Sequence, residues 1–359
     1  MPDWTAPMEQ TYEYYEVDPG TWMDRSLLRT VKSCTINRDS DMETLGSASF
    51  EITDLVGETY VRAYLIVTQN GVRSRHALGT FLVQTPTSTF DGKIRNVSMD
   101  AYTPLLELKE NPPPIGYFIP KDTNVMDAAF SLATDHMRAP VVKGVCNTKS
   151  VYDFVSDPDD TWLSFISAFI SNQLYDSEDG AMISSYVLDL DELGRLLFAP
   201  KQNVAVMQPV WTYTDDNSSI LYPEITMDHD LYGIPNVVEV VYDGYHSRVV
   251  NDDSNSPIST VNRGREIIYR TVNPDMTGYP TQQLVDQYAK QLLESLSTVE
   301  YTITYTHGYC PVRLGDCVLL NYARAGLTNI KAKVISQSIK CTPGCPVTEK
   351  AVYTTKLWG

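Results

Sequence analysis

Residues 299–306 show the strictest pattern in this sequence, a regular alternation of apolar and polar side chains. Val299, Tyr301, Ile303 and Tyr305 are apolar or aromatic, and Glu300, Thr302, Thr304 and Thr306 lie between them. Because successive side chains of a β-strand point to opposite faces, a period of two predicts a strand that buries one face and exposes the other. A helix would spread the same apolar residues around its axis. The pattern therefore predicts that this part of the chain builds a half-buried sheet.

Short strand patterns also dominate the first 105 residues. Asn70-Gly71 separates two β-prone runs and suits the positive φ angles of a tight hairpin turn. Asp91-Gly92 marks a second turn, and almost no helical periodicity interrupts the runs. The expected strands lie at residues 31–36, 47–52, 60–67, 76–83 and 95–99. Strands joined by short turns predict an N-terminal β-barrel or sandwich domain over residues 1–105.

The period changes in residues 106–235, where helices are expected. Beyond the breaker run 111–114, Asp122 or Thr123 can cap a helix that ends before Pro140. A second helix is expected after the acidic run 157–160, since carboxylates stabilise the N-terminal end of a helix. The residues sharing a face are Met126, Ala129, Phe130, Ala133 and Met137 in the first helix, and Trp162, Ile166, Phe169, Ile170 and Gln173 in the second. A hairpin over 183–190 and 195–199, turned at Leu193-Gly194, completes a predicted small α+β insertion domain.

Strand patterns return in residues 236–359. Residues 236–242 read as a strand, 251–257 as an exposed loop, and Thr281 as the cap of one amphipathic helix. Besides 299–306, strands are expected at 318–322, 330–339 and 347–354. This segment is predicted to be a second β-barrel or sandwich domain with one helix. The fold class is therefore α+β and rich in β-structure, with two β domains separated by a small α+β domain.

Charge narrows the possible partners. The chain carries 28 basic and 45 acidic side chains, a net charge of −17. Residues 106–235 hold 7 basic and 20 acidic side chains and account for −13 of that charge. Without a basic excess, the chain cannot be a nucleic-acid binder that works by neutralising phosphates, and attraction to an anionic membrane is disfavoured. The acidic middle segment is either a solvated face that keeps the protein soluble or a surface that avoids anions or faces cations.

Targeting and membrane signals are missing from the sequence. The start has neither the basic nor the apolar region of a signal peptide, and no apolar run reaches the roughly 20 residues that span a bilayer. Six cysteines are too few for a fold built on disulfides. We therefore expect a protein made in a reducing cytoplasm, with no membrane insertion by this chain.

Catalytic motifs are not evident, and no catalytic, cofactor-binding or metal-binding residue is assigned. Three carboxylate groups could suggest a calcium loop or a glycosidase pair: Asp157/Asp159/Asp160, Asp176/Glu178/Asp179 and Asp189/Asp191/Glu192. None keeps the order of an EF-hand loop, and all lie where a helix cap or turn favours acidic residues. The histidines, His76, His136, His229, His246 and His307, form no i, i+4 metal pair. Neither a phosphate-binding loop nor a nucleophile elbow is present.

The cysteines leave several states open. Cys310, Cys317, Cys341 and Cys345 could supply four thiolates to zinc, but their spacing is not that of a common zinc knuckle. A bond between Cys341 and Cys345 is disfavoured by a reducing compartment. Whether these four thiols are free, bridged or metal-bound is left open, and no cofactor is expected.

Several short motifs resemble those of the phage tail hub family, which includes baseplate hubs and the N-terminal parts of tail-tip proteins. They are Leu78-Gly79-Thr80-Phe81-Leu82-Val83 followed by Val97-Ser98-Met99-Asp100-Ala101-Tyr102 and Leu105-Leu106, Asp160-Thr161-Trp162-Leu163, Leu193-Gly194-Arg195-Leu196, and Leu314-Gly315-Asp316-Cys317-Val318. The order of a β domain, an α+β insertion and a second β domain matches the same family. This resemblance covers nearly the whole chain.

The resemblance implies a structural virion protein rather than an enzyme. In that family two tube-like β domains per chain, assembled as a homotrimer, form a pseudo-hexameric ring that joins the tail tube to the tip. DNA passes through the ring without specific binding, past a wall that is typically acidic. Expected partners are the tail tube or distal tail protein, the tape measure protein and tip or fibre proteins. Fibre-binding or wall-degrading activities are expected in those partners, because the sequence ends after its last strand. The expected location is the tail tip or baseplate of the virion, after assembly in the host cytoplasm.

Two other functions remain open. One is a six-fold distal tail or other tail assembly component with a carbohydrate-binding role. The other is a carbohydrate-active hydrolase, in which paired carboxylates such as Asp176 and Asp189 would flank a glycosidic bond. Six copies per particle would indicate the first, and turnover of a glycan would indicate the second.

Overall fold

A computed structural model of the protein describes residues 2–53, 57–90, 92–93, 95–171, 175–176, 182–183, 185–229, 231–274 and 281–358. By backbone proximity the chain forms two compact units. The first unit comprises residues 1–224 and 305–350, and the second comprises residues 225–304 and 351–359. The domain boundaries predicted after residues 105 and 235 remain predictions.

The N-terminal strands of the first unit form one antiparallel series. They are β1 (Glu9–Val17), β2 (Asp24–Leu27), β3 (Val31–Asp39), β4 (Gly46–Ile52), β5 (Thr59–Gln69), β6 (Val72–Phe90) and β7 (Arg95–Tyr102). The predicted turn at Asn70-Gly71 joins β5 to β6, with positive φ angles of 51° and 76°. Glycine and asparagine tolerate these angles at little steric cost, so the turn fixes the register of the longest hairpin.

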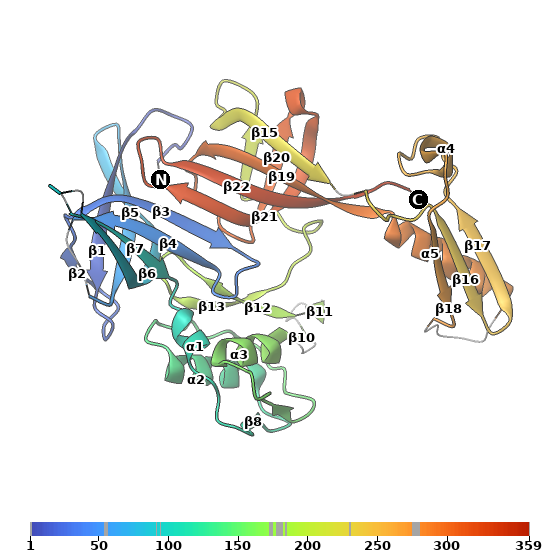
Figure 1. Ribbon diagram of the computed structural model, residues 1–359, viewed down its shortest axis with the longest axis horizontal. Helices are drawn as coiled ribbons and strands as arrows, with labels where there is room; N and C mark the ends of the chain where they lie inside the picture. The colour runs from blue at the N-terminus through green and yellow to red at the C-terminus, as the bar shows by residue number, and fades with distance from the viewer. Residues whose placement is uncertain are drawn as a thin grey trace. The chain divides into compact units, whose positions relative to one another are not determined.

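The C-terminal strands join the same sheet. They are β14 (Trp211–Thr214), β15 (Leu221–His229), β19 (Thr298–Gly308), β20 (Cys317–Tyr322), β21 (Leu327–Lys340) and β22 (Pro346–Lys356), with a short 3-10 turn η1 (Ala323–Ala325) before β21. The two series meet where β21 pairs with β3 in antiparallel register, Ser336 opposite Asp39 and Lys340 opposite Thr35. Thirteen strands thereby form one sheet (Figure 1), and among the described residues its order, β15-β19-β22-β21-β3-β4-β7-β6-β5-β1-β2, is an open path.

A small helical layer lies at one end of the first unit, and the hairpin of residues 186–200 that belongs to it lies on the side facing the large sheet (Figure 1). Its elements are α1 (Leu106–Glu110), β8 (Phe118–Ile119), α2 (Val125–His136), β9 (Phe154–Val155), α3 (Trp162–Ser171), β10 (Tyr175–Asp176), β11 (Met182–Ile183), β12 (Tyr186–Leu190) and β13 (Leu196–Pro200). Asn124, rather than the predicted Asp122 or Thr123, caps α2, because its side chain accepts a hydrogen bond from the Asp127 amide.

The core of this layer is continuous with the N-terminal strands. Val17, Tyr60 and Leu82 of the sheet belong to the same buried cluster as Phe165 of α3 and Leu196 of β13. Each of these side chains is at most 3% exposed. The α+β segment therefore packs onto the N-terminal sheet as one folded body.

The second unit is built around a three-stranded sheet and one long helix. Its elements are β16 (Val237–Tyr242), β17 (Tyr245–Val250), α4 (Thr260–Arg263), β18 (Ile268–Val272) and α5 (Gln282–Leu296). β16 lies between antiparallel β17 and parallel β18. Thr281 caps α5 as predicted, and Val285, Ala289 and Leu293 bury its apolar face against Val238 and Val240. The loop 251–257 differs from its prediction at two positions, because Asn251 and Ser256 are buried and hydrogen-bonded to each other at 2.8 Å.

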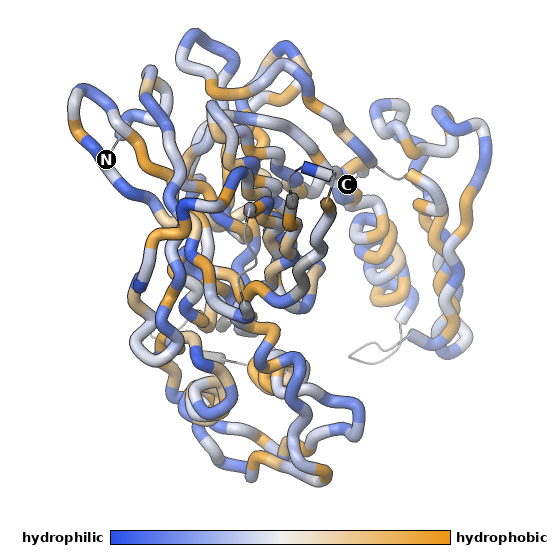
Figure 2. Tube along the Cα trace, turned by 60° about the vertical axis from the view of Figure 1, so that its left-hand side comes forward, coloured by the Kyte–Doolittle hydropathy of each residue, from blue (hydrophilic) through white to orange (hydrophobic). Residues whose placement is uncertain are grey.

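Alternation along the strands confirms the β-rich fold class. Figure 2 shows hydrophobic and hydrophilic residues following one another along the strand traces. In β19, Val299, Ile303 and Tyr305 are buried and their neighbours are more exposed, as the period of two predicted. No helix among the described residues is long and apolar enough to cross a membrane.

Candidate functional site

The turn between β12 and β13 is the point where the helical layer, the N-terminal strands and the C-terminal strands meet. The Leu193 carbonyl accepts hydrogen bonds from Trp22 Nε1 at 2.7 Å and from the Arg62 guanidinium at 3.1 Å. We call this turn and its arginine partners the joint: residues 189–195 with Arg38, Arg62 and Arg313. The joint holds the helical layer on the large sheet.

Arg62 holds the joint from the N-terminal strands. Its side chain is almost fully buried in β5, where Nε donates to Thr80 Oγ1 at 2.8 Å and one terminal nitrogen lies 3.0 Å from Asp24. A buried charge is tolerated only when it is paired and its donors are satisfied. The contacts to Asp24, Thr80 and Leu193 meet that requirement, so Arg62 can stay charged at the joint.

Arg313 holds the joint from the C-terminal half. Its guanidinium lies 2.9 Å from Glu192 and 3.5 Å from Asp189, and it donates to the Leu190 carbonyl at 2.8 Å. Burial alone would lower the pKa of Arg313, but these carboxylates outweigh burial and raise it. Burial raises the pKa of Asp189, and Arg313 partly opposes that shift. Arg38 of β3 adds a longer ion pair to Glu192, at 3.8 Å.

Gly194 allows the turn of the joint to pack tightly against Thr80 and Pro104. Its φ of 75° lies in the left-handed region, and a Cβ atom built on it would lie 2.8 Å from Thr80 Cβ and 3.3 Å from Pro104 Cγ. Any other residue would therefore meet both backbone strain and steric overlap. The resemblance motifs converge here, because Thr80, Gly194 and Leu314, which follows Arg313, all line one hollow.

A second polar cluster is buried within the C-terminal strands, and we call it the Glu349 network. The Glu349 carboxylate accepts hydrogen bonds from Gln337 Nε2 at 2.6 Å, Tyr305 OH at 2.8 Å and Tyr213 OH at 3.2 Å. Its other neighbour is His307 Nε2, at 3.3 Å, and both of these side chains are fully buried. Gln337 Oε1 accepts a hydrogen bond from Arg38 at 3.1 Å, which links this network to the joint.

The Glu349 network holds an ion pair. Burial alone would lower the pKa of His307, but its contacts with Cys310 and Glu349 raise it to about 10. Burial alone would raise the pKa of Glu349, but His307, Gln337 and Tyr305 lower it. The pair is therefore charged at neutral pH, in a core where each charge depends on the other.

Four of the described carboxylates considered as catalytic candidates, Asp160, Asp189, Asp191 and Glu192, have structural partners. Asp160 accepts from the Ser164 hydroxyl at 2.9 Å and from the Asp157 amide at 2.8 Å, as a turn before α3 would require. Asp191 accepts from the Leu193 and Arg195 amides at 3.0 and 2.8 Å. The side chains of Asp176, Glu178 and Asp179 lie outside the described residues, as do Gln173 of the predicted second helix and Asp91 of the predicted second turn.

The histidines are scattered. His76 lies 2.9 Å from the Ser74 hydroxyl, His136 stacks on Trp162 at 4.2 Å, and His246 is exposed. The His229 side chain lies outside the described residues. His307 alone of the described imidazoles has a buried carboxylate partner.

All six cysteines are free thiols in the structure, including Cys310, Cys317, Cys341 and Cys345. Among the described residues, no group of three or more His, Cys, Asp or Glu side chains is placed to hold a metal ion. The four-thiolate zinc site considered from the sequence therefore has no geometric support.

The arginines of the joint and the Glu349 network were missed by sequence reasoning, although the sequence carries a signal for them. Arg62 interrupts an otherwise apolar run, and Glu349 lies between Val347 and Ala351 at positions of the same parity. A charged residue on the buried face of a predicted strand must have a partner. The identity of that partner, His307, depends on the strand order.

Replacing Gly194 should loosen the joint. We expect Gly194→Ala to destabilise the first unit by about 2–4 kcal/mol, from a left-handed φ and a Cβ overlap with Thr80. Gly116→Ala is the matched control, because Gly116 also has a positive φ of 77° but no atom within 4 Å of the added Cβ. Chemical denaturation measures both variants, and equal losses in the two would contradict the proposed steric role of Gly194.

Neutralising Glu349 should destabilise the C-terminal strands. We expect Glu349→Gln to cost about 3 kcal/mol or more, because His307 loses its buried partner. Glu51→Gln is the control, because the Glu51 side chain on β4 is exposed, and it should change the stability little.

The same pair predicts a pH dependence. The pKa of His307 is raised from 6.5 to about 10 in the folded state. Its stabilising contribution is therefore complete below pH 6.5 and lost as the pH rises toward 10. The lowered pKa of Glu349 adds a second loss below about pH 4.5. The free energy of unfolding, measured from pH 6 to 10, should fall in the wild type and fall less in Glu349→Gln. The same pH dependence in both proteins would contradict the ion pair.

Comparison with known proteins supports the fold rather than a chemistry. No protein-family model matches the chain, and no curated protein matches its sequence. Solved structures do match: a tail protein from Neisseria meningitidis MC58 is 14% identical, with a TM-score of 0.58 over 96% of this chain and 97% of that chain. The 43 kDa tail protein of prophage MuSo2 from Shewanella oneidensis is 11% identical, with a TM-score of 0.58 over 96% of this chain and 98% of that chain.

A chain in the Francisella PdpA–VgrG complex also matches, at 8% identity and a TM-score of 0.52, over 96% of this chain and 52% of that longer chain. At such low identities the likeness shows the fold alone. The resemblance found in the sequence motifs is confirmed at that level: this chain has the fold of phage tail proteins, over nearly its whole length.

Proposed function

We propose that this protein is a structural component of a phage tail, a hub of which three copies form a ring of six β modules between tail tube and tip. The observation that carries the proposal is the β3–β21 pairing. It joins the N-terminal and C-terminal strands of one chain edge to edge in a single sheet. One polypeptide thereby supplies two neighbouring segments of one continuous wall. Three polypeptides would supply six such segments, and a ring of six segments matches a tube with sixfold symmetry.

Ring closure would use the ends of the open strand path. Edge strands present unpaired backbone N–H and C=O groups, and β2 and β15 end the path in the described chain. A heterologous contact, in which one edge of a copy meets the opposite edge of the next, closes into a ring when the rotation fits. The likeness to tail proteins supports this mode of assembly, and the trimer itself is our proposal.

A polar face at the centre of the sheet supports the proposal that the sheet lines a channel for DNA. On β3, β4, β7 and residues 336–340 of β21, the residues opposite the core face include Ser33, Thr35, Asn37, Asp39, Ser47, Ser49, Glu51, Ser98, Asp100, Tyr102, Ser336, Ser338 and Lys340. Their register places them in contiguous rows, such as Lys340, Thr35, Ser49 and Asp100. We call this surface the hydroxyl face. Outside this set, Lys331 and Lys333 continue the same face of β21 toward β20.

The composition of the hydroxyl face suits the wall of a channel through which DNA slides. Lys340 is the only basic residue in that set, and three acidic residues accompany it. DNA is retained mainly by Lys and Arg contacts to phosphates, so a wall of small hydroxyls with few cations would retain it weakly. We propose that this face lines the channel, although the family wall is expected to be more strongly acidic.

The partners follow from that position. We propose contacts with the tail tube or distal tail protein on one side of the ring, and with tape measure, tip or fibre proteins on the other. We propose no catalytic role, because Asp189, Asp191 and Glu192, which were considered for a hydrolase, are engaged in structural ion pairs with arginines. The virion tail tip or baseplate is the proposed location.

The first test is stoichiometry. We expect native mass spectrometry of the purified protein, alone or with tube protein, to give a trimer of about 121 kDa, three times the 40.3 kDa chain. A monomer under both conditions would contradict the ring. Six copies per particle would instead favour the distal tail alternative.

The second test concerns the hydroxyl face. We expect Ser49→Lys combined with Ser98→Lys to slow DNA release from otherwise intact particles, because the added cations would bind phosphates. High salt should restore the rate by screening. The control carries Glu at the same two positions and should release DNA normally. Unchanged release in the Lys variant would show that this face does not line the conduit.

A further inference from the structure

A pair of thiols lies at one end of the β3–β21 pairing. The register of this pairing ends with Lys340 opposite Thr35, and one step further places Cys341 opposite Cys34. The Cys341 amide donates to the Cys34 carbonyl at 2.9 Å, which confirms that the two backbones are adjacent. Two cysteines that are more than 300 residues apart in sequence therefore meet where the two halves of the sheet join.

The two thiols lie in the same buried environment. Cys34 is 2% exposed and Cys341 is 6% exposed. Burial raises the pKa of the Cys34 thiol well above its usual value, and the Cys341 thiol beside it raises that pKa further. Both thiols are therefore shielded from solutes, and the raised pKa keeps the Cys34 thiol protonated.

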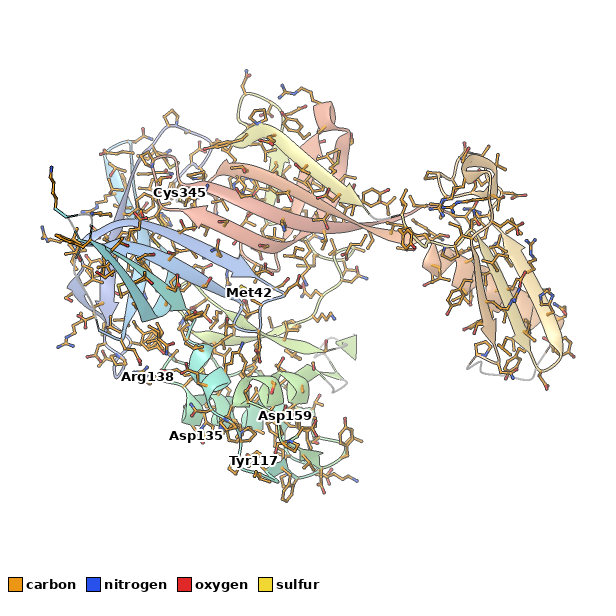
Figure 3. The ribbon with its side chains drawn as sticks, in the orientation of Figure 1. Met42, Tyr117, Asp135, Arg138, Asp159 and Cys345 are labelled. Carbon is orange, nitrogen blue, oxygen red and sulfur yellow. The ribbon has the colours of Figure 1, made fainter. Side chains whose placement is uncertain are left out.

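Cys345 lies close to the pair but faces a different partner. Burial raises the pKa of the Cys345 thiol to about 12, and a hydrogen bond with Tyr12 opposes the shift. The Tyr12 hydroxyl also donates to the Thr342 carbonyl at 2.7 Å, which fixes it under the 341–345 turn. Figure 3 places Cys345 beside the large sheet where β22 begins. Cys341, and not Cys345, is the cysteine that lies directly opposite Cys34 in the strand register.

The backbone spacing suits a disulfide. Directly opposite residues of an antiparallel pair that share hydrogen bonds have Cα atoms about 5.5 Å apart. Disulfides span Cα distances of about 4.4–6.8 Å, with Cβ atoms near 3.8 Å. The Cβ atoms of such a strand pair stand up to about 5.5 Å apart, so they would have to approach by up to about 1.7 Å. That movement is small enough for the end of a strand pair.

We propose that Cys34 and Cys341 form a disulfide site that covalently joins the two halves of the sheet when the protein meets a small-molecule disulfide outside the reducing cytoplasm. The Cys341 thiolate attacks one sulfur of the oxidant, forms a mixed disulfide and releases one small thiol. The Cys34 thiolate then attacks the Cys341 sulfur of the mixed disulfide and releases the second small thiol. Each protein thiol loses one proton, and the oxidant is reduced to two thiols.

Burial controls the rate of this reaction. The thiolate is the attacking species, and both sulfurs are buried when the strand pair is intact, with the pKa of Cys34 raised by burial. The bond therefore forms only when the end of the strand pair opens locally, and it then stabilises the protein by constraining the unfolded chain over a loop of about 300 residues. This inference does not depend on the hub proposal, because both cysteines belong to one chain.

The experiment incubates the purified full-length protein with glutathione disulfide at pH 8, with urea below the unfolding transition to promote local opening. Free thiols are then blocked, and peptides are mapped by mass spectrometry without reduction. We expect a peptide pair linked through Cys34 and Cys341, and a thermal midpoint raised by about 5 °C that returns to its starting value with dithiothreitol.

Control variants distinguish the proposed bond from its competitors. Cys345→Ser and Cys317→Ser should keep both the link and the shift in midpoint, since Cys317 lies on β20. Cys34→Ser and Cys34→Ala should lose both. A Cys341–Cys345 link in the wild type, no link at all, or an oxidative midpoint shift that persists in the Cys34 variants would overturn the proposal.

Discussion

The antiparallel pairing of β3 with β21 is the contact on which the first unit depends. It connects strands separated by about 300 residues, so both termini of the fold must be in place before the sheet is continuous. Pairings of such long sequence separation form late, because the entropy of closing the intervening chain must be overcome first. Once formed, the pairing makes two short series of strands into one wall, from which the proposed ring segment and the proposed disulfide both follow.

Buried charges set the geometry around that wall. Arg38 connects the Glu349 network, through Gln337, with Glu192 of the joint. A buried ion pair contributes little net stability compared with a well-packed apolar pair, but removing one member is costly. Such a network penalises other arrangements of the hairpin and sheet more than it strengthens the native one. In the proposed ring, where each copy would match neighbours on several sides, a unique arrangement matters more than additional stability.

The distribution of charge follows the same logic on the surface. The acidic excess of the sequence is concentrated in residues 106–235, whereas the hydroxyl face of the large sheet carries few charges. The acidic excess and the proposed channel wall thus lie on different parts of one chain. In Figure 3, Tyr117, Asp135 and Asp159 lie in the helical layer, away from the strands that form the hydroxyl face.

Local patterns in the sequence determined most of the secondary structure. The alternation at 299–306, the Asn70-Gly71 turn and the Thr281 cap each depend on contacts within a few residues, and each was predicted correctly. The cap of α2 was wrong by one or two residues, because Asp122, Thr123 and Asn124 are all competent caps and only the local geometry selects one.

Tertiary structure decided the rest. No local pattern pairs β3 with β21, brings Arg62 and Arg313 to opposite sides of the Leu193-Gly194 turn, or places His307 beside Glu349. The sequence shows only that these charged residues lie at positions expected to be buried. Their partners are fixed by strand order, because hydrogen bonds and ion pairs act over a few ångströms in space, whatever the separation along the chain.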